Sequence, residues 1–413
     1  MKIYLVGGAV RDSLLNLPIK DRDWVVVGGT KEILLKKKFQ QVGKDFPVFL
    51  HPETHEEYAL ARKERKSGKG YTGFYTEFNS DVTLEEDLIR RDLTINAIAK
   101  DEYGNYIDPF QGKKDLELRL LRHVSDSFIE DPLRVLRTAR FAASLAHLGF
   151  YIDKKTMILM SKMVKKNELL YLTKNRIWNE TEKAFKTSNP HVYFQVLYSC
   201  KALYSVFPEI YFLYERKRFS SPLFQNLYNS CFLSMGLSKI RILTKDISIQ
   251  FSYLCQFLPQ KIEFSSTKKN YDEYAATFVK RLCNRFDVPL NIRELAVLNA
   301  GFYVFLNSIH YQSSKNIVDM FSKIDAWRKP DRIYKLSFLS DFNLFHHNQN
   351  KIFNFKLKTG FLKKCFFIVK DVSVKKILNQ GFKGYNIRNE LNKLRVKKLE
   401  LWRMKKKYFF LKK

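Results

Sequence analysis

The sequence has 413 residues, of which 45% are hydrophobic, and its 73 Lys and Arg against 42 Asp and Glu give a formal net charge of +31. This length and apolar content exclude an intrinsically disordered chain and are sufficient for two or more domains. The charge favours a polyanionic partner, because each phosphate neutralised by Lys or Arg releases counterions, and the alternative is a solvated lysine-rich surface.

The first part of the chain alternates strand-like and helix-like patterns. Residues 2–8 (KIYLVGG) and 22–28 (RDWVVVG) are apolar and β-branched, so we expect two strands, with a helix over residues 9–17 between them. Further strands and turns are expected at 56–64 and 94–110. The pattern predicts a small α/β region at the amino end.

A glycine pair, Gly7-Gly8, precedes the first predicted helix. Glycine lets the backbone approach a ligand closely, and the free N–H groups at a helix start can bind phosphate. Arg11, one turn into the helix, offers a forked donor to phosphate oxygens. The alternatives are a tight strand-to-helix turn and a surface salt bridge between Arg11 and Asp12.

Asp21 and Asp23 stand at the beginning of the second apolar segment. Residues two apart in a strand project to the same face, so we expect the two carboxylates side by side. Such a pair stays ionised only beside a compensating cation, and Mg²⁺ typically takes one or two carboxylates plus substrate phosphates. The pair is therefore a candidate magnesium site, although a D-x-D sequence alone is more often a solvated strand end.

From about residue 115 onward, glycine is sparse and long helical patterns with Lys and Arg faces predominate. The clearest covers 131–149, where Pro132 suits the first helical position and Gly149 the C-terminal stop. Asp131 has the position of an N-cap, and three arginines follow it at intervals of three. Segment 260–275 has the composition of a surface loop.

Residues 5–28, LVGGAVRDSLLNLPIKDRDWVVVG, resemble the signature of the nucleotidyltransferases that build and repair the 3′-terminal CCA of tRNA, a class shared with bacterial poly(A) polymerases. Segments 90–99 (RRDLTINAIA), 108–116 (DPFQGKKDL) and 130–142 (EDPLRVLRTARFA) are similar to later motifs of this family and follow in its order. Segment 61–74 matches the position of its flexible loop, and Gly112 that of a hinge. Weaker likeness continues at 323–333 and 381–391.

The resemblance implies an α/β nucleotidyltransferase head, a small mixed sheet with helices, followed by a mostly α-helical neck, body and tail. Their predicted bounds are 1–120 for the catalytic head, 121–190 for the neck with a base template, and 191–413 for the basic tRNA-binding body and tail. The activity implied is Mg²⁺-dependent addition and repair of CCA on tRNA from CTP and ATP, with release of pyrophosphate. Residues 351–413 carry 20 Lys and Arg against three acidic residues, which fits a tRNA-binding role.

The same resemblance implies the site residues. Asp21 and Asp23 match the catalytic metal ligands, and Glu57 or Glu64 could supply a third carboxylate. Asp92 and Asn96, four residues apart, would suit one helix face. The implied nucleotide contacts are Gly8, Arg11, Arg91, Asp131, Arg134, Arg137 and Arg140.

In the family, the carboxylate and guanidinium that match Asp131 and Arg134 act as a template for the incoming base. A carboxylate only accepts, which suits the exocyclic amine of cytosine or adenine, and a guanidinium only donates, which suits the neighbouring ring nitrogen. Uracil and guanine reverse both positions and would leave buried charged groups unpaired. The capping and template roles of Asp131 compete for one carboxylate, and both stay open.

Two alternatives remain, a poly(A) polymerase with the same head and a non-catalytic tRNA-binding protein. Some bacterial members carry a phosphohydrolase site with a His-Asp dipeptide, which this sequence lacks, so we expect a degenerate region there without phosphatase or cyclic phosphodiesterase activity. The five Cys are scattered and form no C-x-x-C pair, which predicts free thiols. The sequence has no membrane-spanning apolar run and no signal peptide, so we expect a cytoplasmic protein. The sequence indicates no obligate protein partner.

Overall fold

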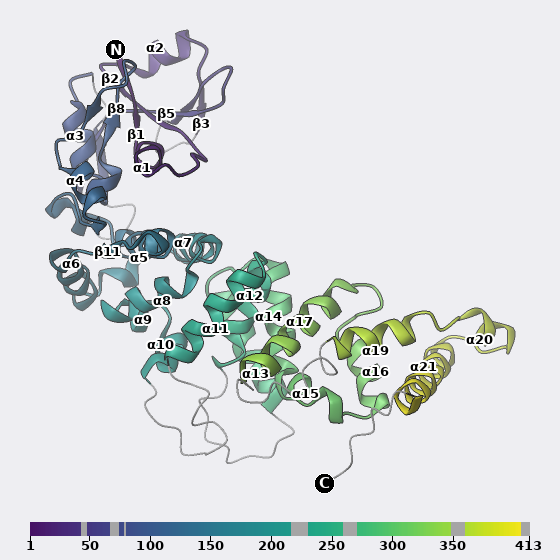
Figure 1. Cartoon of the computed structure of the whole chain (residues 1–413). Helices are drawn as coiled ribbons and strands as arrows, with labels where there is room; N and C mark the ends of the chain where they lie inside the picture. Colours follow the sequence, from purple (N-terminus) through teal and green to yellow (C-terminus); the bar gives the residue numbers. More distant parts are fainter. Residues whose placement is uncertain are drawn as a thin grey trace. The chain divides into compact units, whose positions relative to one another are not determined.

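The computed structural model describes residues 1–42, 48–66, 74–77, 80–215, 230–258, 271–347 and 360–405. These residues form two compact units, Met1–Glu215 and Arg216–Lys413 (Figure 1). The predicted fold class, an α/β head followed by a mostly helical remainder, is confirmed. In the described part of the chain, no helix is long and apolar enough to cross a membrane.

The first unit contains a mixed sheet with the strand order β3-β4-β5-β2-β1-β8-β9. β1 and β2 are antiparallel, with Val6 opposite Asp23, while β2 and β5 are parallel, with Asp23 opposite Glu57. The strands are β1 (Lys2–Val6), β2 (Asp23–Val27), β3 (Gln40–Val42), β4 (Val48–Leu50), β5 (Glu57–Leu60), β8 (Ala99–Lys100) and β9 (Tyr106–Ile107), and β6 (Lys63–Lys66) pairs separately with β7 (Phe74–Glu77).

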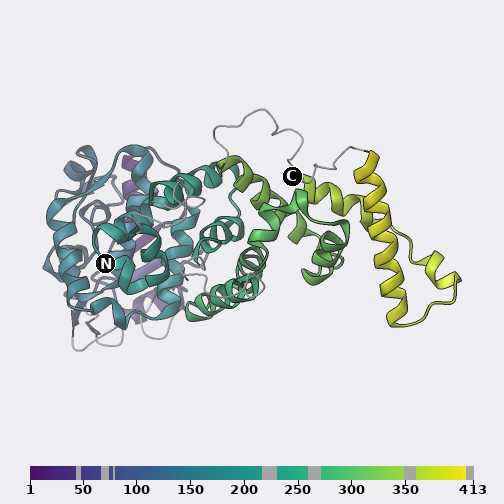
Figure 2. The same cartoon turned by 90° about the horizontal axis from the view of Figure 1, so that it is seen from below.

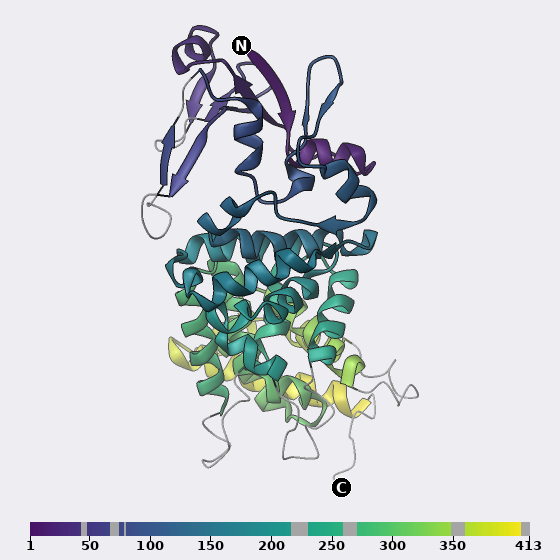
Figure 3. The same ribbon diagram turned by 90° about the vertical axis from the view of Figure 1, so that its left-hand side faces the viewer.

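Helices cover both faces of this sheet (Figure 3). Val26 and Trp24 of β2 pack with Leu34 of α2 (Lys31–Lys36) on one face. Val25 packs with Leu88 of α3 (Leu84–Ile89) on the other. Because side chains alternate along a strand, Asp23 shares the face of Val25 and is directed to the side of α3.

The helical part of the first unit surrounds α5. The predicted helix 131–149 is found as α5 (Leu133–Leu145) and a 3-10 turn that ends at Gly149, whose φ of 82° confirms it as the stop. α5 packs against α7 and α8. The other elements are α1 (Gly8–Leu14), η1 (Thr94–Asn96), α4 (Gly112–Glu117), β10 (Leu120–Leu121), η2 (Asp126–Glu130), β11 (Tyr151–Ile152), α6 (Lys154–Lys165), η4 (Glu168–Tyr171), α7 (Lys174–Lys186), α8 (Pro190–Ser199), α9 (Ala202–Val206) and α10 (Pro208–Glu215).

The described part of the second unit is helical. α21 packs against α16 and α19 (Figure 2), and its Arg395 lies 3.5 Å from the ring centroid of Trp327. The helices are α11 (Ser230–Leu243), α12 (Ile247–Cys255), α13 (Tyr271–Arg285), α14 (Leu290–Gly301), α15 (Tyr303–Asn307), α16 (Ser314–Lys323), α17 (Asp331–His347), α19 (Phe361–Lys370), α20 (Lys375–Asn379) and α21 (Tyr385–Lys405).

Two smaller expectations can be compared with these elements. Of the predicted loop 260–275, residues 260–270 lie outside the described part, and 271–275 are wrong as a loop because α13 begins at Tyr271. The acidic first turn of α13, with Asp272 and Glu273, favours that helix start. The four cysteines whose side chains are described are buried, and none of the four forms a disulfide in the described part of the chain. The predicted domain bounds at residues 120 and 190 stay predictions.

A buried carboxyl group in the second unit makes stability depend on pH. Asp341 of α17 accepts a hydrogen bond from the backbone N–H of Gly360, the residue before α19 (2.8 Å). Burial raises the pKa of Asp341 to about 6 from 3.8, although the Gly360 bond and the charge of Lys364 oppose the rise. The ionised form is therefore disfavoured in the folded protein, and stability is lost as pH rises from about 4 to above 6.

We predict that Asp341→Asn stabilises the protein at pH 8 by roughly 1–2 kcal/mol after allowance for solvent screening, because an amide can still accept the Gly360 N–H without ionising. The gain should shrink as pH falls through about 6 and be absent near pH 4. Urea unfolding of both proteins at pH 4, 6 and 8 measures it. A difference that does not change with pH would contradict the prediction.

Candidate active site

The turn between β1 and α1 requires glycine at its first position. Gly7 has φ 70° and ψ −130°, a conformation that residues with a Cβ atom rarely adopt. A Cβ atom there would also lie 3.2 Å from Nη1 of Arg91. At Gly8 a Cβ atom would lie 3.6 Å from Nη2 of Arg11, an ordinary contact. Gly7 therefore allows the Arg91 guanidinium to lie against the turn.

Asp23 is the first residue of β2 and lies on the α3 side of the sheet, and Asp21 precedes it by two residues. β2 begins at Asp23, one residue later than predicted, and Asp21 lies in the loop before it. The pKa of Asp23 is raised, chiefly by burial. The charge of Arg91 opposes this rise, the charge of Asp21 adds to it, and the charge of Arg137 opposes it. Two acids and two arginines therefore meet here, although strand alternation does not account for the position of Asp21.

Arg91 is held by Asp87, the fully buried acid in the last turns of α3. Nη2 of Arg91 lies 3.0 Å from Oδ2 of Asp87, and Nε of Arg90 donates to Oδ1 of the same carboxylate at 3.0 Å. Burial acts to raise the pKa of Asp87, but the charges of Arg90 and Arg91 hold it below its usual value. Asp87 thus remains ionised and fixes both arginines.

A buried polar chain joins α1, η1 and α5. Nη1 of Arg11 donates to Oδ1 of Asn96 (2.7 Å), and Nδ2 of Asn96 donates to Oδ1 of Asp92 (2.9 Å). Nε of Arg137 donates to Oδ2 of Asp92 (2.7 Å). Burial acts to raise the pKa of Asp92, but Arg137 and Asn96 depress it strongly, and Asp92 raises the pKa of Arg137. Arg11 also pairs with Asp12 at 2.7 Å, the predicted alternative, yet its side chain is buried rather than on the surface.

Three arginines near the site share contact with one aromatic ring. Phe141 of α5 lies beneath the guanidinium groups of Arg11, Arg137 and Arg140, at 5.2, 5.6 and 4.0 Å from its centroid. Arg140 forms an ion pair with Glu180 of α7. Burial lowers the pKa of Arg140, although Glu180 opposes the change. Arg140 is therefore directed to α7 as well as to the shared ring.

The predicted template residues both have partners. Oδ1 of Asp131 accepts from the backbone N–H of Leu133 (3.0 Å), and its Oδ2 accepts from Nη2 of Arg176 on α7 (2.8 Å). Nη1 of Arg134 donates to the carbonyl of Ser127 (2.7 Å) and Nη2 to the carbonyl of Arg90. α5 begins at Leu133, one residue after the predicted Pro132, but Asp131 does bond to its first N–H.

The structure thus brings Asp21, Asp23, Arg91 and Arg137 together, with Arg11 connected through Asn96 and Asp92. Arg134 is connected through the Arg90 carbonyl, whereas Asp131 and Arg140 are tied to α7. Sequence reasoning missed Asp87, Arg176 and Glu180. Asp87 was detectable, because it stands three and four residues before Arg90 and Arg91, the spacing of neighbours on a helix. Arg176 and Glu180 gave no such local signal.

The sequence also predicted a third carboxylate, a flexible loop and a hinge glycine. Glu57 lies opposite Asp23 in the β2–β5 register, while the side chain of Glu64 is outside the described part. Among the described side chains, no three His, Cys, Asp or Glu gather closely enough to hold a metal ion. Residues 67–73 of the predicted flexible loop 61–74 also lie outside the described part of the chain. A Cβ atom at Gly112 would lie 2.3 Å from the Thr94 carbonyl oxygen, so Gly112 is required for packing, and its hinge role stays a prediction.

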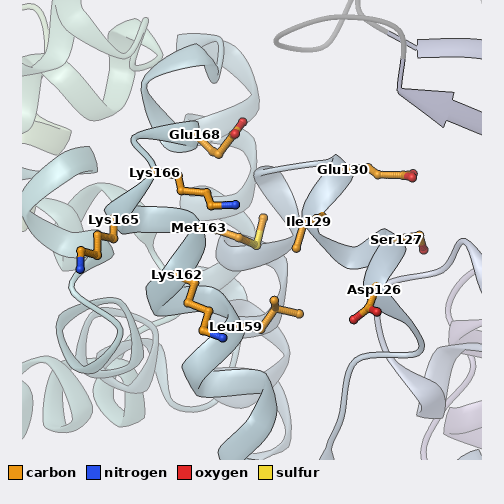
Figure 4. A pocket seen from close by; sticks show the side chains of 10 residues that line it. All are labelled: Asp126, Ser127, Ile129, Glu130, Leu159, Lys162, Met163, Lys165, Lys166 and Glu168. Carbon is orange, nitrogen blue, oxygen red and sulfur yellow. The ribbon is translucent and has the colours of Figure 1, made fainter.

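A separate cavity of about 630 Å³ lies between η2 and α6 (Figure 4). Leu159 and Met163 contribute to its apolar lining, and three lysines and three acidic residues surround them. None of the predicted site residues lines it. The balanced charges give it no preference for an anion, so we assign the chemistry to the β2 region.

Comparisons with known proteins show the family of this chain. The poly A polymerase head domain matches residues 3–122, and the probable RNA- and SrmB-binding site of polymerase A matches residues 149–213. The CCA-adding enzyme of Buchnera aphidicola subsp. Schizaphis graminum is 81% identical over 100% of both chains. That of Buchnera aphidicola subsp. Baizongia pistaciae is 52% identical over 98% of this chain and 97% of its own.

Solved structures share the fold. A CCA-adding enzyme in complex with ATP has a TM-score of 0.65 at 21% identity and covers 96% of this chain and 86% of its own. The Thermotoga maritima CCA-adding enzyme complexed with tRNA has a TM-score of 0.62 at 20% identity and covers 96% of this chain and 87% of its own.

We predict that Gly7→Ala destabilises the protein by about 2–3 kcal/mol, because a Cβ atom strains the backbone and crowds Arg91. The matched control is Gly149→Ala, where φ is also positive but nothing lies within 4 Å of the added atom; it should cost roughly 1 kcal/mol. Urea unfolding compares the two variants. Equal costs would show that Arg91 does not crowd the turn.

Proposed function

The chain belongs to the CCA-adding enzymes, a family of tRNA nucleotidyltransferases, and we propose that Asp21 and Asp23 form its catalytic centre. The enzyme adds and repairs the 3′-terminal CCA of tRNA, using CTP and ATP and releasing pyrophosphate. The observation that carries the proposed site is the place of Asp23 at the start of β2, opposite Val6 and therefore beside the Gly7 turn against which the Arg91 guanidinium lies.

Mg²⁺ is the ion we propose for the two aspartates. Their carboxylates are hard oxygen donors, and the raised pKa of Asp23 reflects burial and the neighbouring Asp21, both of which a divalent cation would offset. When bound, such an ion lowers the pKa of an attacking hydroxyl and stabilises the charge on phosphoryl oxygens. The donor set therefore fits the ion.

The remaining residues of the site bind and orient the nucleotide. Arg91, held against Gly7 by Asp87, is available to the triphosphate, and Gly8 leaves room for a close approach of the backbone. Arg11, Arg137 and Arg140 surround Phe141 and place three further positive charges near the site. Fixed charges of this kind favour the transfer of a phosphoryl-linked group, because positioning and charge stabilisation supply most of its catalysis.

Asp131 and Arg134 are the proposed template for the base. Asp131 accepts one hydrogen bond at each carboxylate oxygen, from the N–H of Leu133 and from Arg176, and each such oxygen has two lone pairs. The carbonyls of Ser127 and Arg90 fix the guanidinium of Arg134 near the same helix start. Capping and base recognition are compatible at Asp131, because the Leu133 N–H occupies a single lone pair.

The helical part of the chain is the proposed tRNA-binding region. We keep the bounds 1–120 for the head, 121–190 for the neck and 191–413 for the body and tail. α21 supports the assignment, since Lys393, Lys397 and Lys398 on it are exposed. Double-stranded RNA is recognised mostly by shape and phosphate contacts, which a basic helical surface can supply.

Extension of a tRNA lacking its CCA end, with each nucleotide supplied separately, tests this function. The protein should add C from CTP, and A only after two C residues. Long A tracts from ATP alone would instead identify a poly(A) polymerase. No incorporation of any nucleotide would leave the non-catalytic tRNA-binding alternative.

Replacing Asp23 by Ala should reduce nucleotide addition by roughly a thousandfold or more, because the metal contributes several kcal/mol in the transition state. The affinity for tRNA should change little, since the proposed tRNA-binding region is the helical part of the chain. Single-turnover extension and filter binding measure the two quantities. Glu53→Ala, an exposed carboxylate outside the site, is the control. Near-normal addition by the Asp23 variant would remove Asp23 from catalysis.

Replacing Arg134 by Ala should lower the preference for CTP and ATP over UTP and GTP by about ten- to a hundredfold, because the donor to the ring nitrogen is lost. The measurement is kcat/KM for each of the four nucleotides, with urea unfolding as the check on folding. A slower enzyme with the same order and spread of preferences would refute the template role.

A further inference from the structure

Asp87 is a buried charge that the predicted set of site residues does not include. Its side chain is fully buried at the end of α3. Its carboxylate bonds Nε and Nη2 of Arg90, Nη2 of Arg91 and, at 3.4 Å, the backbone N–H of Arg62. One carboxylate thus holds two guanidinium groups, one more than charge neutralisation requires.

The two arginines lead to different parts of the proposed site. The Arg91 guanidinium lies against Gly7, and the preceding residue, Val6, is opposite Asp23 in the β1–β2 register. The backbone carbonyl of Arg90 accepts from Nη2 of Arg134. A shift of this dipeptide would therefore move the proposed triphosphate contact and the support of the proposed base template together.

The hydrogen bonding of Arg91 indicates a constrained side chain. Its Nε is buried and has no hydrogen-bond acceptor among the described residues. An unsatisfied buried donor costs free energy, so this placement does not optimise the bonds of Arg91 itself. The pair with Asp87 at 3.0 Å keeps the side chain there despite that cost.

We propose that Asp87 is a positioning residue that fixes Arg91, and through the Arg90 carbonyl also Arg134, for binding of the nucleoside triphosphate. The inference rests on the proposed function. Asp87 touches neither the reacting atoms nor the nucleotide. Its effect passes through the arginines, and this separates it from a charge pair that only stabilises the fold.

The test uses the full chain with Asp87→Asn, which keeps the shape and removes the charge. We expect the dissociation constant for CTP without RNA, measured calorimetrically, and the KM for CTP to rise about tenfold, with the KM for tRNA unchanged. Asp87→Glu keeps the charge but displaces it by one methylene group, and should raise the KM for CTP severalfold even if the Asn variant folds poorly.

The control is Asp153→Asn, which removes a carboxylate that caps α6 and lies 3.4 Å from Arg122 in the same unit. It should lower stability without changing CTP affinity. A double-mutant cycle with Arg91→Gln follows, in which Asp87→Asn should raise the dissociation constant for CTP less than it does in the wild type, because only the route through Arg90 and Arg134 remains. Equal effects of Asp87→Asn in both backgrounds would overturn the inference.

The outcomes separate this inference from the proposed function. If the wild type binds CTP and adds C, but both Asp87 variants lower only the free energy of unfolding, Asp87 is merely structural and the function stands. If the wild type neither binds CTP nor adds any nucleotide, both the function and the inference fail.

Discussion

The ion pair between the buried carboxylate of Asp92 and the partly exposed side chain of Arg137 is the interaction on which the site depends. It joins the helix of the proposed base template to the segment that carries Arg91, and Asn96 extends it to Arg11 beside the glycine turn. A buried carboxylate is costly unless it is hydrogen-bonded, and Asp92 accepts from Arg137, from the amide of Asn96 and from the backbone N–H of Leu93. These bonds favour one geometry for α1, η1 and α5.

The site combines two acidic side chains, Asp21 and Asp23, with two arginines, Arg91 and Arg137. Two acids side by side repel, and burial adds to the cost of ionising Asp23. Arg91 and Arg137 offset part of that cost, but both already pair with other carboxylates, Asp87 and Asp92. Both arginines are therefore held in place by carboxylates other than Asp21 and Asp23. In the proposed function, the bound metal ion and the triphosphate complete the charge balance of these side chains.

Local patterns were predictable from the sequence, and long-range partners were not. Gly149, the apolar strands and the alternation of elements follow from backbone preferences and periodicity. The pairs Asp131–Arg176, Arg137–Asp92 and Arg140–Glu180 join residues 40 to 45 positions apart. Composition and spacing do not encode which of many charges meet across the fold. The strand start at Asp23 also shows that alternation alone could not place Asp21.

The most direct test of the account is to locate a divalent ion. Crystals grown with CTP and Mn²⁺, a Mg²⁺ substitute with measurable anomalous scattering, would show an ion bonded to carboxylate oxygens of both Asp21 and Asp23 and to phosphate oxygens of the nucleotide. Bound CTP with no ion at these carboxylates, or an ion held by other residues, would contradict the account.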